Sequence, residues 1–448
     1  MNQTSPLRWY LCLLLFFATT LCFLDRQVLS VLSPEICKEF GMSDQDYSFV
    51  TNGFLISYAA MFFLGGVLID KLGTRFGLGF SVLVWTIASG IHAIIRTPFQ
   101  MGAARFVLGA GEGGCFPGAA KAAAEWFPKK ERALAIGISI GGASLGGIIA
   151  PPLTIWLNGL FGWRGAFAAT GLFGLIWCVL WFAFYSYASR RGELPTADQD
   201  ESGSYDKTPT RSSANERQSN ERQSNERPSN ERSSNEQATF TNSGTTYRLV
   251  VAIVGLSLAR FIFDPVFYFY MFWIPKYLVQ ECGANAKIIA LTGLPFLAMG
   301  ITNIIGGFAS DWLVRRGVPV LSARRRIMFA AAAVTIASSF VPLFQKNPYV
   351  AIFLMSMLMF GHGFWITNYV ALISDNFPKK MVATVMGFSG LVGTIGGLAA
   401  NTAIGYVADQ YSFLPIWIAS GFLYPLAFFV IRTTVRNIAA PTEQRNPN

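Results

Sequence analysis

Residues 125–133 read EWFPKKERA and residues 375–383 read DNFPKKMVA, so one pattern returns after 250 residues. A glycine-rich apolar segment follows each copy, with glycines at matching positions: Gly137, Gly146 and Gly147 in the first, and Gly387, Gly396 and Gly397 in the second. The first segment also carries Gly141 and Gly142, and we expect its five glycines to let that helix approach a neighbour closely. The run GVLID at 66–70 likewise has an echo, GFASD, at 307–311. The chain therefore repeats a single unit.

The composition shows which class of protein holds this repeat. Of the 448 residues, 52% are hydrophobic and 13% are charged, about half of the usual charged share. These charges are too few to cover the surfaces of several soluble domains. The net charge of +10 lies between long apolar runs, so nucleic acid is not an expected partner. The composition excludes a soluble enzyme, a disordered protein and a disulfide-rich secreted module, and it predicts a polytopic membrane protein.

Apolar runs of roughly 20 residues, which suffice to cross a bilayer, occur six times before a polar segment and six times after it. The first six lie near residues 9–32, 46–69, 77–95, 99–121, 132–158 and 164–188. The second six lie near residues 248–278, 287–313, 325–344, 348–375, 381–406 and 412–433. We expect an all-α fold of twelve transmembrane helices. The sequence has no phosphate loop, metal-ligand cluster or nucleophile elbow, so no enzyme activity, cofactor or metal is expected.

Basic residues in the short loops predict the orientation of these helices. One set of loops holds twelve of them: Lys71, Arg75, Lys129, Lys130, Arg132, Arg315, Arg316, Arg324, Arg325, Arg326, Lys379 and Lys380. The opposite set holds six: Lys38, Arg96, Arg164, Lys276, Lys287 and Lys346. The richer set predicts a cytoplasmic face that also carries both termini. Both halves then have the same orientation, which is typical of a parallel repeat of two six-helix bundles.

The polar segment divides the chain into four parts. We expect a six-helix half at 1–189, a linker at 190–246, a second six-helix half at 247–435 and a cytoplasmic tail at 436–448. The linker contains NERQSNERQSNERPSNERSSNE at 215–236, a low-complexity repeat without apolar residues. Such a composition cannot bury a core, so we expect a disordered cytoplasmic tether. A partner-binding segment is the alternative.

The loop sequence GVLIDKLGTR at 66–75 resembles the loop between helices 2 and 3 of the major facilitator superfamily. Gly73 permits a tight turn. Asp70, Lys71 and Arg75 can latch helix ends at a cytoplasmic gate, and Asp311 is the counterpart of Asp70 in the second half. A basic loop that only sets topology is the alternative.

The fourth apolar run narrows the resemblance. Its sequence ARFVLGAGEGGCFP at 104–117, followed by Lys121 and EWFPKKER, is similar to the anion:cation symporter branch of that superfamily. This branch includes bacterial carriers of hexuronates, galactonate and related sugar acids. The runs LRWY at 7–10 and NPYVAI at 347–352 favour the hexuronate carriers. The resemblance implies a major facilitator fold and a monomeric, multi-pass protein of the bacterial inner membrane.

Six ionisable residues lie inside the predicted spans: Asp25, Arg26, Arg105, Glu112, Arg260 and Asp264. Each charge in the middle of a membrane helix costs roughly 2.5–3.5 kcal/mol on insertion scales, so each needs a reason. Seven residues make two turns, which places Arg105 and Glu112 on one face about 10 Å apart. Arg260 and Asp264 are four apart and can pair along their own helix.

Three arginines that converge from different helices would bind an anion, because a guanidinium stays charged and grips a carboxylate with two hydrogen bonds. Proton coupling needs a carboxyl group that takes up and releases a proton as its surroundings change. The resemblance implies that Arg26, Arg105 and Arg260 bind the substrate anion. It also implies that Glu112 and Asp25 carry the proton.

Two polar residues complete the expected site by the same resemblance. Tyr58 matches a substrate-site position, and Asn401 is a further candidate that could bond a sugar oxygen. The alternatives are structural: an ion pair between Asp25 and Arg26, helix bracing by Arg105, packing by Tyr58, and a cross-link between helices by Asn401.

The leading hypothesis is a proton-coupled symporter that imports a sugar-acid anion, such as glucuronate or galacturonate, by rocking its two halves about a central site. The expected partners are a small organic anion, protons and the lipid bilayer. The alternatives are a carrier of another organic anion such as galactonate or glucarate, an exchanger or exporter of the same fold, and a sensor that does not transport.

Overall fold

The structure, a computed structural model, describes residues 6–127, 129–194, 243–377 and 379–435. The regular elements there are helices: α1 (Leu7–Phe40), α2 (Asp44–Ile91), η1 (His92–Ile94), α3 (Pro98–Glu112), α4 (Cys115–Trp126), α5 (Lys129–Arg190), α6 (Ser243–Phe272), α7 (Ile274–Cys282), α8 (Ala286–Ala290), α9 (Gly293–Arg315), α10 (Val320–Thr335), η3 (Ile336–Phe344), α11 (Pro348–Asn376), α12 (Lys379–Gln410) and α13 (Leu414–Thr434). Most of the predicted linker and the predicted tail lie outside the described residues.

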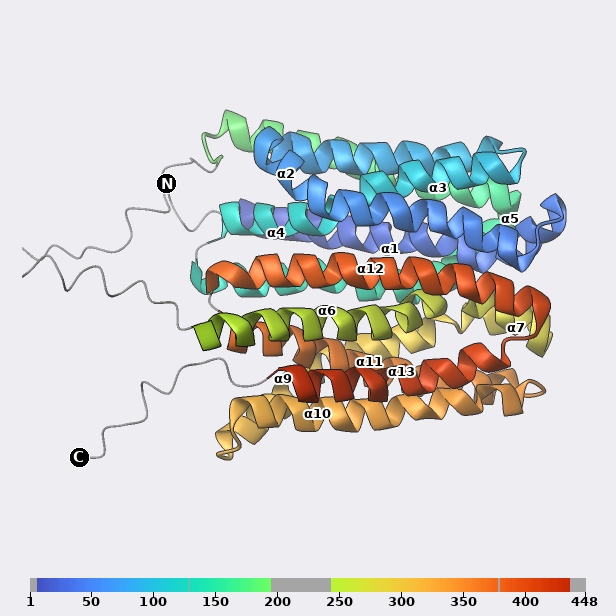
Figure 1. Cartoon of the computed structure of the whole chain (residues 1–448). Helices are drawn as coiled ribbons and strands as arrows, with labels where there is room; N and C mark the ends of the chain where they lie inside the picture. Colours follow the sequence, from blue (N-terminus) through green and yellow to red (C-terminus); the bar gives the residue numbers. More distant parts are fainter. Residues whose placement is uncertain (1–5, 128, 195–242, 378, 436–448) are drawn as a thin grey trace, which may run out of the picture.

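The helices lie side by side in one bundle, and the two ends of the chain leave it at the same end (Figure 1). Large apolar side chains such as Phe99, Phe308 and Leu343 are mostly exposed on its surface. A surface this apolar is unfavourable in water and suits contact with lipid chains. Together with the long apolar helices, it shows a multi-pass membrane protein.

Two long helices break at positions predicted to be loops. Gly73 interrupts α2 with φ 73° and ψ 159°, and Gly162 interrupts α5 with φ 69° and ψ 174°. A residue with a Cβ rarely adopts such angles, whereas glycine does so readily. Among the described residues, nine helical stretches are long and apolar enough to cross a membrane, and two of these contain the breaks. The count of twelve spans stays a prediction.

The glycines of α5 divide between close contact and open space. At Gly142 and Gly146, an added Cβ would overlap backbone oxygens of α1, and at Gly147 it would meet an aromatic ring of α9 at 3.0 Å. At Gly137 and Gly141 nothing lies within 4 Å. The expectation that all five glycines bring this helix close to a neighbour is therefore wrong for Gly137 and Gly141, which face away from the packed side.

Helices α1–α5 and α6–α13 form two groups, coloured blue to green and yellow to red in Figure 1. Between the groups, α2 lies against α12, α5 against α9, and α1 against α7. These contacts bring α1, α3 and α6, the helices that carry the predicted intramembrane charges, to the interior of the bundle.

Candidate functional site

Asp25 and Arg26 are neighbours on α1 with different partners. Successive residues of an α-helix point about 100° apart, so the two side chains leave the helix in different directions. Asp25 Oδ1 accepts a hydrogen bond from Ser89 Oγ of α2 at 3.0 Å. Arg26 Nε donates to Glu112 Oε2 of α3 at 2.5 Å. The ion pair at this point therefore joins α1 to α3 and does not join the two neighbours.

Aromatic rings surround the guanidinium of Arg26. Its Cζ lies 4.3 Å from the ring centre of Tyr58, 5.0 Å from that of Phe23 and 5.2 Å from that of Phe54. Rings at this range stabilise a cation through their negative faces. Cys22 Sγ also donates a hydrogen bond to Glu112 Oε2, at 3.4 Å. The predicted substrate-site residue Tyr58 thus lies directly against the predicted anion-binding Arg26.

Arg105 and Glu112 both reach from α3 to α1, as their seven-residue spacing predicts. Arg105 Nη1 donates to the backbone oxygen of Asp25 at 3.4 Å, and both side chains are buried. Several of their polar atoms have no hydrogen-bond partner: Arg105 Nε and Nη2, Glu112 Oε1, and also Asp25 Oδ2. Such atoms are costly to bury. Ionisable groups kept in a membrane at this cost are typical of functional sites.

Arg260 and Asp264 form an ion pair on α6, with Nε and Oδ2 2.9 Å apart. The pair packs on a glycine face of α12: a Cβ added to Gly393 would overlap the Asp264 carboxylate, and one added to Gly390 would lie 3.4 Å from Arg260 Nη1. The Arg260 side chain is 24% exposed, against 3% for Arg26. Arg260 is thus the more accessible of these two predicted anion-binding arginines.

An aromatic path leads from Arg26 toward Arg260 across the two helix groups. The ring of Tyr58 lies 5.8 Å from that of Phe62, centre to centre. The Cβ position of Gly390 is 3.8 Å from the Phe62 ring and 3.4 Å from Arg260 Nη1. The structure therefore brings the two arginines to opposite ends of one short chain of contacts. A carboxylate with several hydroxyl groups has the chemistry to bind there, since aromatic faces suit the sugar ring and guanidinium groups its charge.

Asn401 of α12 is fully engaged by the protein. Its Nδ2 donates to the backbone oxygen of Ser48 at 3.1 Å, to Thr51 Oγ1 at 2.8 Å and to Asn52 Oδ1 at 2.7 Å. Its Oδ1 accepts from Trp273 Nε1 at 2.6 Å. In this structure the amide therefore cross-links the two helix groups, the arrangement that the structural alternative describes.

The predicted gate residues lie near the end of the bundle that holds the termini. Asp70 pairs with Lys121 of α4 at 2.7 Å. Lys71 is exposed, and the Arg75 guanidinium lies 5.0 Å from the ring centre of Phe76. Asp70, the acidic member of the predicted gate, thus pairs with Lys121 of α4.

The second half repeats this arrangement with a different cation. Arg324 bonds Asp311 at 2.9 Å and Asp375 at 3.0 Å. In the first half, Lys121 takes the same place between Asp70 and Glu125, which lies 3.9 Å away. The acidic residues therefore lie at matching positions of the sequence repeat. The bridging cation does not, because Lys121 lies on α4 and Arg324 on α10.

Sequence reasoning missed two groups of polar residues. Cys22 and Ser89 lie in apolar runs and look like small packing residues, so nothing in one sequence marks them as partners of Glu112 and Asp25. The count of basic loop residues places Lys276 in a loop, although it falls inside the apolar run predicted at 248–278. A lysine inside such a run is the signal that could have found it. The structure places it in a buried ion pair with Asp44.

Comparisons with known proteins identify the family to which the chain is similar. Residues 15–401 and 322–446 match the model of the family described as the Major Facilitator Superfamily. The chain is 28% identical to a hexuronate transporter of Escherichia coli (strain K12), over 98% of this chain and 96% of that protein. It is 26% identical to a D-galactonate transporter of Escherichia coli O6:H1, over 92% and 93%. A crystal structure of a D-xylose–proton symporter superposes with a TM-score of 0.72 at 13% identity, covering 96% of this chain and 98% of that one.

Proposed function

The chain belongs to the Major Facilitator Superfamily and is a transporter rather than an enzyme, and from this premise we propose that it is a proton-coupled symporter for a sugar-acid anion. Glucuronate and galacturonate are the substrates to test first, since relatives along nearly the whole chain are named hexuronate transporters. In this proposal the protein acts as a monomer in a bacterial inner membrane, with both termini and the 190–246 linker on the cytoplasmic side.

The buried pair of Arg26 and Glu112 is the observation that carries the proposal. When Glu112 is ionised, its carboxylate pairs with the Arg26 guanidinium, with Oε2 and Nε 2.5 Å apart. When Glu112 takes up a proton, its charge is lost and the guanidinium needs another anion. A substrate carboxylate supplies that anion, so one proton on Glu112 allows one carboxylate on Arg26. Proton and substrate then enter the site together, which is what symport requires.

In this proposal, Arg260 is the arginine that the substrate carboxylate contacts first. Its partial exposure and its pairing through Nε leave the two Nη groups to approach a carboxylate in the fork geometry. Asp25 and Arg105 are buried like Arg26, and Arg105 on α3 donates a hydrogen bond to the backbone oxygen of Asp25 on α1. We assign Asp25 to proton uptake and Arg105 to the charge balance of the bound anion. Asn401 reaches the substrate once the bonds that now hold it are broken.

Other organic anions remain the second candidate, because relatives named for galactonate and for galactarate or glucarate match over nine-tenths of the chain. All these substrates share a carboxylate beside several hydroxyl groups. Guanidinium groups and aromatic rings recognise these shared features, and the described residues of the site suit each of these acids equally.

Uptake into proteoliposomes tests the proposal. We expect glucuronate or galacturonate to accumulate when the lumen is alkaline and the outside acidic, and to equilibrate without the gradient. Galactonate and glucarate form the second arm, and glucose, which lacks the carboxylate, is the matched negative substrate. Uptake that does not depend on the proton gradient would contradict proton coupling. If none of the acids in the panel is taken up, the proposed substrate class is wrong.

A further inference from the structure

The polar contacts between the two helix groups gather at one end of the bundle. Among the described residues, every hydrogen bond that joins α1–α5 to α6–α13 involves the far ends of α1, α2, α6, α7 and α12. This is the end opposite the chain termini in Figure 1. At the terminal end, the gate pairs described above stay within their own half.

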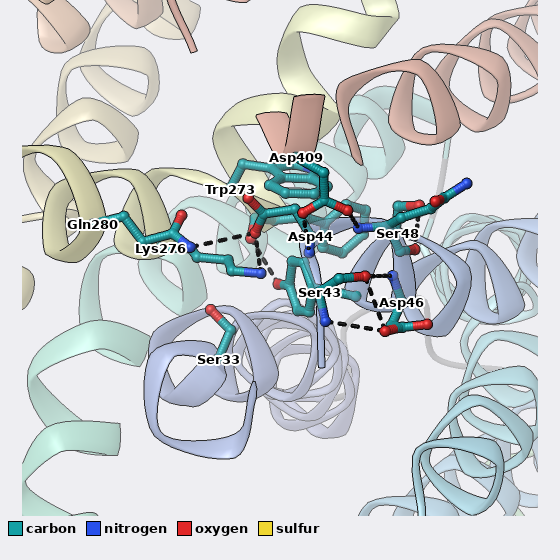
Figure 2. A network of polar contacts seen from close by, with 12 residues as sticks. Ser33, Ser43, Asp44, Asp46, Ser48, Trp273, Lys276, Gln280 and Asp409 are labelled. Carbon is teal, nitrogen blue, oxygen red and sulfur yellow. Dashed lines mark hydrogen bonds and ion pairs between the residues drawn. The ribbon is translucent and has the colours of Figure 1, made fainter. Parts of the chain in front are cut away.

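A buried ion pair lies at the centre of these contacts. Asp44, in the first turn of α2, pairs with Lys276 of α7, and both residues are buried. Figure 2 shows the lysine passing beside Trp273 toward the Asp44 carboxylate. The Lys276 ammonium also lies 4.8 Å from the ring centre of Tyr47 and 5.6 Å from that of Trp273. The pair is thus closed off from water by aromatic rings of both helix groups.

Asp409 adds a second bridge from the end of α12. Its two carboxylate oxygens accept hydrogen bonds from the backbone N–H groups of Asp44 and Gln45, both at 2.7 Å (Figure 2). These N–H groups belong to the first turn of α2, where they have no partner within the helix. An acid is favourable there because it meets the positive end of the helix dipole. A residue of one half therefore caps a helix of the other.

Neutral hydrogen bonds surround these charges. Tyr47 Oη donates to the backbone oxygen of Phe272 at 2.7 Å, and Ser30 Oγ donates to the same oxygen at 3.0 Å. Phe272 is the last residue of α6, and Trp273 alone separates it from the start of α7. The break between α6 and α7 thus exposes a carbonyl that two residues of the other half bind.

We propose that Asp44, Lys276 and Asp409 form the latch of an outer gate, which holds the far end of the two helix groups closed and opens when the halves rock apart. The proposal rests on the proposed function only for its direction, since the far end is the outer one if the termini are cytoplasmic. In the closed state Asp44 and Lys276 form a buried ion pair, and Asp409 binds the backbone N–H groups at the start of α2. In the open state water solvates each of them, so separation needs no other partner.

The latch also gives the substrate site its access. In this proposal, a closed far end leaves the terminal end as the side from which a substrate reaches Arg26 and Arg260. Breaking the latch favours the opposite state, because the open form loses nothing from the substitution while the closed form loses its cross-half bonds.

Distance measurements between spin labels test this without any substrate. Labels at Phe99→Cys and Tyr411→Cys report the separation of the two groups at the far end, since both residues are exposed there. The background carries Cys282→Ser, because Cys282 alone among the six cysteines is not buried. Lys276→Met and Asp409→Asn each remove one bridge. Lys287→Met is the matched control, because Lys287 is exposed near the same end and forms no ion pair with another described residue.

We expect one short distance in the parent protein and in Lys287→Met. In Lys276→Met, the ratio of long to short distances should rise by roughly tenfold or more, which is the scale for breaking a buried charge pair. Asp409→Asn should shift the ratio in the same direction by less, and because Asp409 is exposed this variant also reports if Lys276→Met does not fold. Distances that are unchanged in both variants would overturn the latch. Such a result would leave the substrate proposal standing, since no substrate takes part.

Discussion

At the scale of single residues, burial separates the arginines that the sequence treats alike. Arg26 and Arg105 are almost completely buried, whereas Arg260 keeps a quarter of its side chain exposed. Arg26 also has a full set of partners, with Glu112 on Nε and aromatic rings against its plane. A lysine at this position would keep the charge but lose the planar fork and its stacking.

Arg26→Lys should therefore weaken substrate binding by about 10- to 100-fold, because the charge stays while the two-pronged hydrogen bonding and the ring stacking are lost. Binding of glucuronate by calorimetry measures this. Arg96→Lys is the control, since Arg96 is exposed and distant from the site. Equal affinities in the two variants would show that the guanidinium shape at position 26 does not matter for the anion.

The ion-pair partner of Glu112 can be predicted from the sequence only in part. The seven-residue spacing places Arg105 and Glu112 on one face, and both do reach α1. The choice of Arg26 as the partner of Glu112 depends on how α1 and α3 are rotated and shifted against each other. That register comes from side-chain packing between helices, which the hydrophobic pattern of either helix alone does not determine.

At the scale of helices, glycine determines how closely α1 and α5 pack. Gly142 faces α1, where an added Cβ would overlap the Phe16 backbone oxygen and lie 2.8 Å from Thr20 Oγ1. Gly141, the adjacent residue, faces open space. The sequence predicts a glycine-rich contact here, but it does not show which of two neighbouring glycines makes it.

Gly142→Ala should lower the free energy of unfolding by about 1–3 kcal/mol, because the overlap involves backbone that cannot move aside. Gly141→Ala should be neutral or stabilise by up to about 1 kcal/mol through helix propensity. Thermal unfolding of the two purified variants in the same detergent compares them. A loss of stability at Gly141 that matches the loss at Gly142 would contradict the packing described for α5.

The breaks and boundaries of the helices were the more predictable part. The loops at Gly73 and Gly162 follow from the lengths of apolar runs and from glycine's freedom at positive φ. The far-end contacts were not predictable in the same way. Asp44, Lys276 and Asp409 are ordinary charges near predicted helix ends, and only the folded arrangement brings residues 44 and 409 together.

At the scale of the whole molecule, the repeat explains the architecture and the charges explain its use. Each half carries the same acids at the terminal end, Asp70 and Glu125 in one and Asp311 and Asp375 in the other. The functional charges break this symmetry, because the Arg26–Glu112 pair belongs to the first half and the Arg260–Asp264 pair to the second. A site between two similar halves with different charges can bind one asymmetric anion.

The central claim is that a proton on Glu112 frees Arg26 to bind the substrate carboxylate, so that proton and substrate enter the site together. Glu112→Gln tests it most directly, because a glutamine resembles the protonated acid and cannot release a proton. The measurement compares two modes of hexuronate movement in proteoliposomes, namely accumulation driven by a proton gradient and exchange of labelled for unlabelled substrate at equilibrium. Glu35→Gln, at an exposed carboxylate, is the control.

We predict that Glu112→Gln loses accumulation, keeps exchange, and makes exchange independent of pH, while Glu35→Gln behaves as the parent. Gradient-driven accumulation that survives in Glu112→Gln would contradict the account, because the proton would then be carried elsewhere.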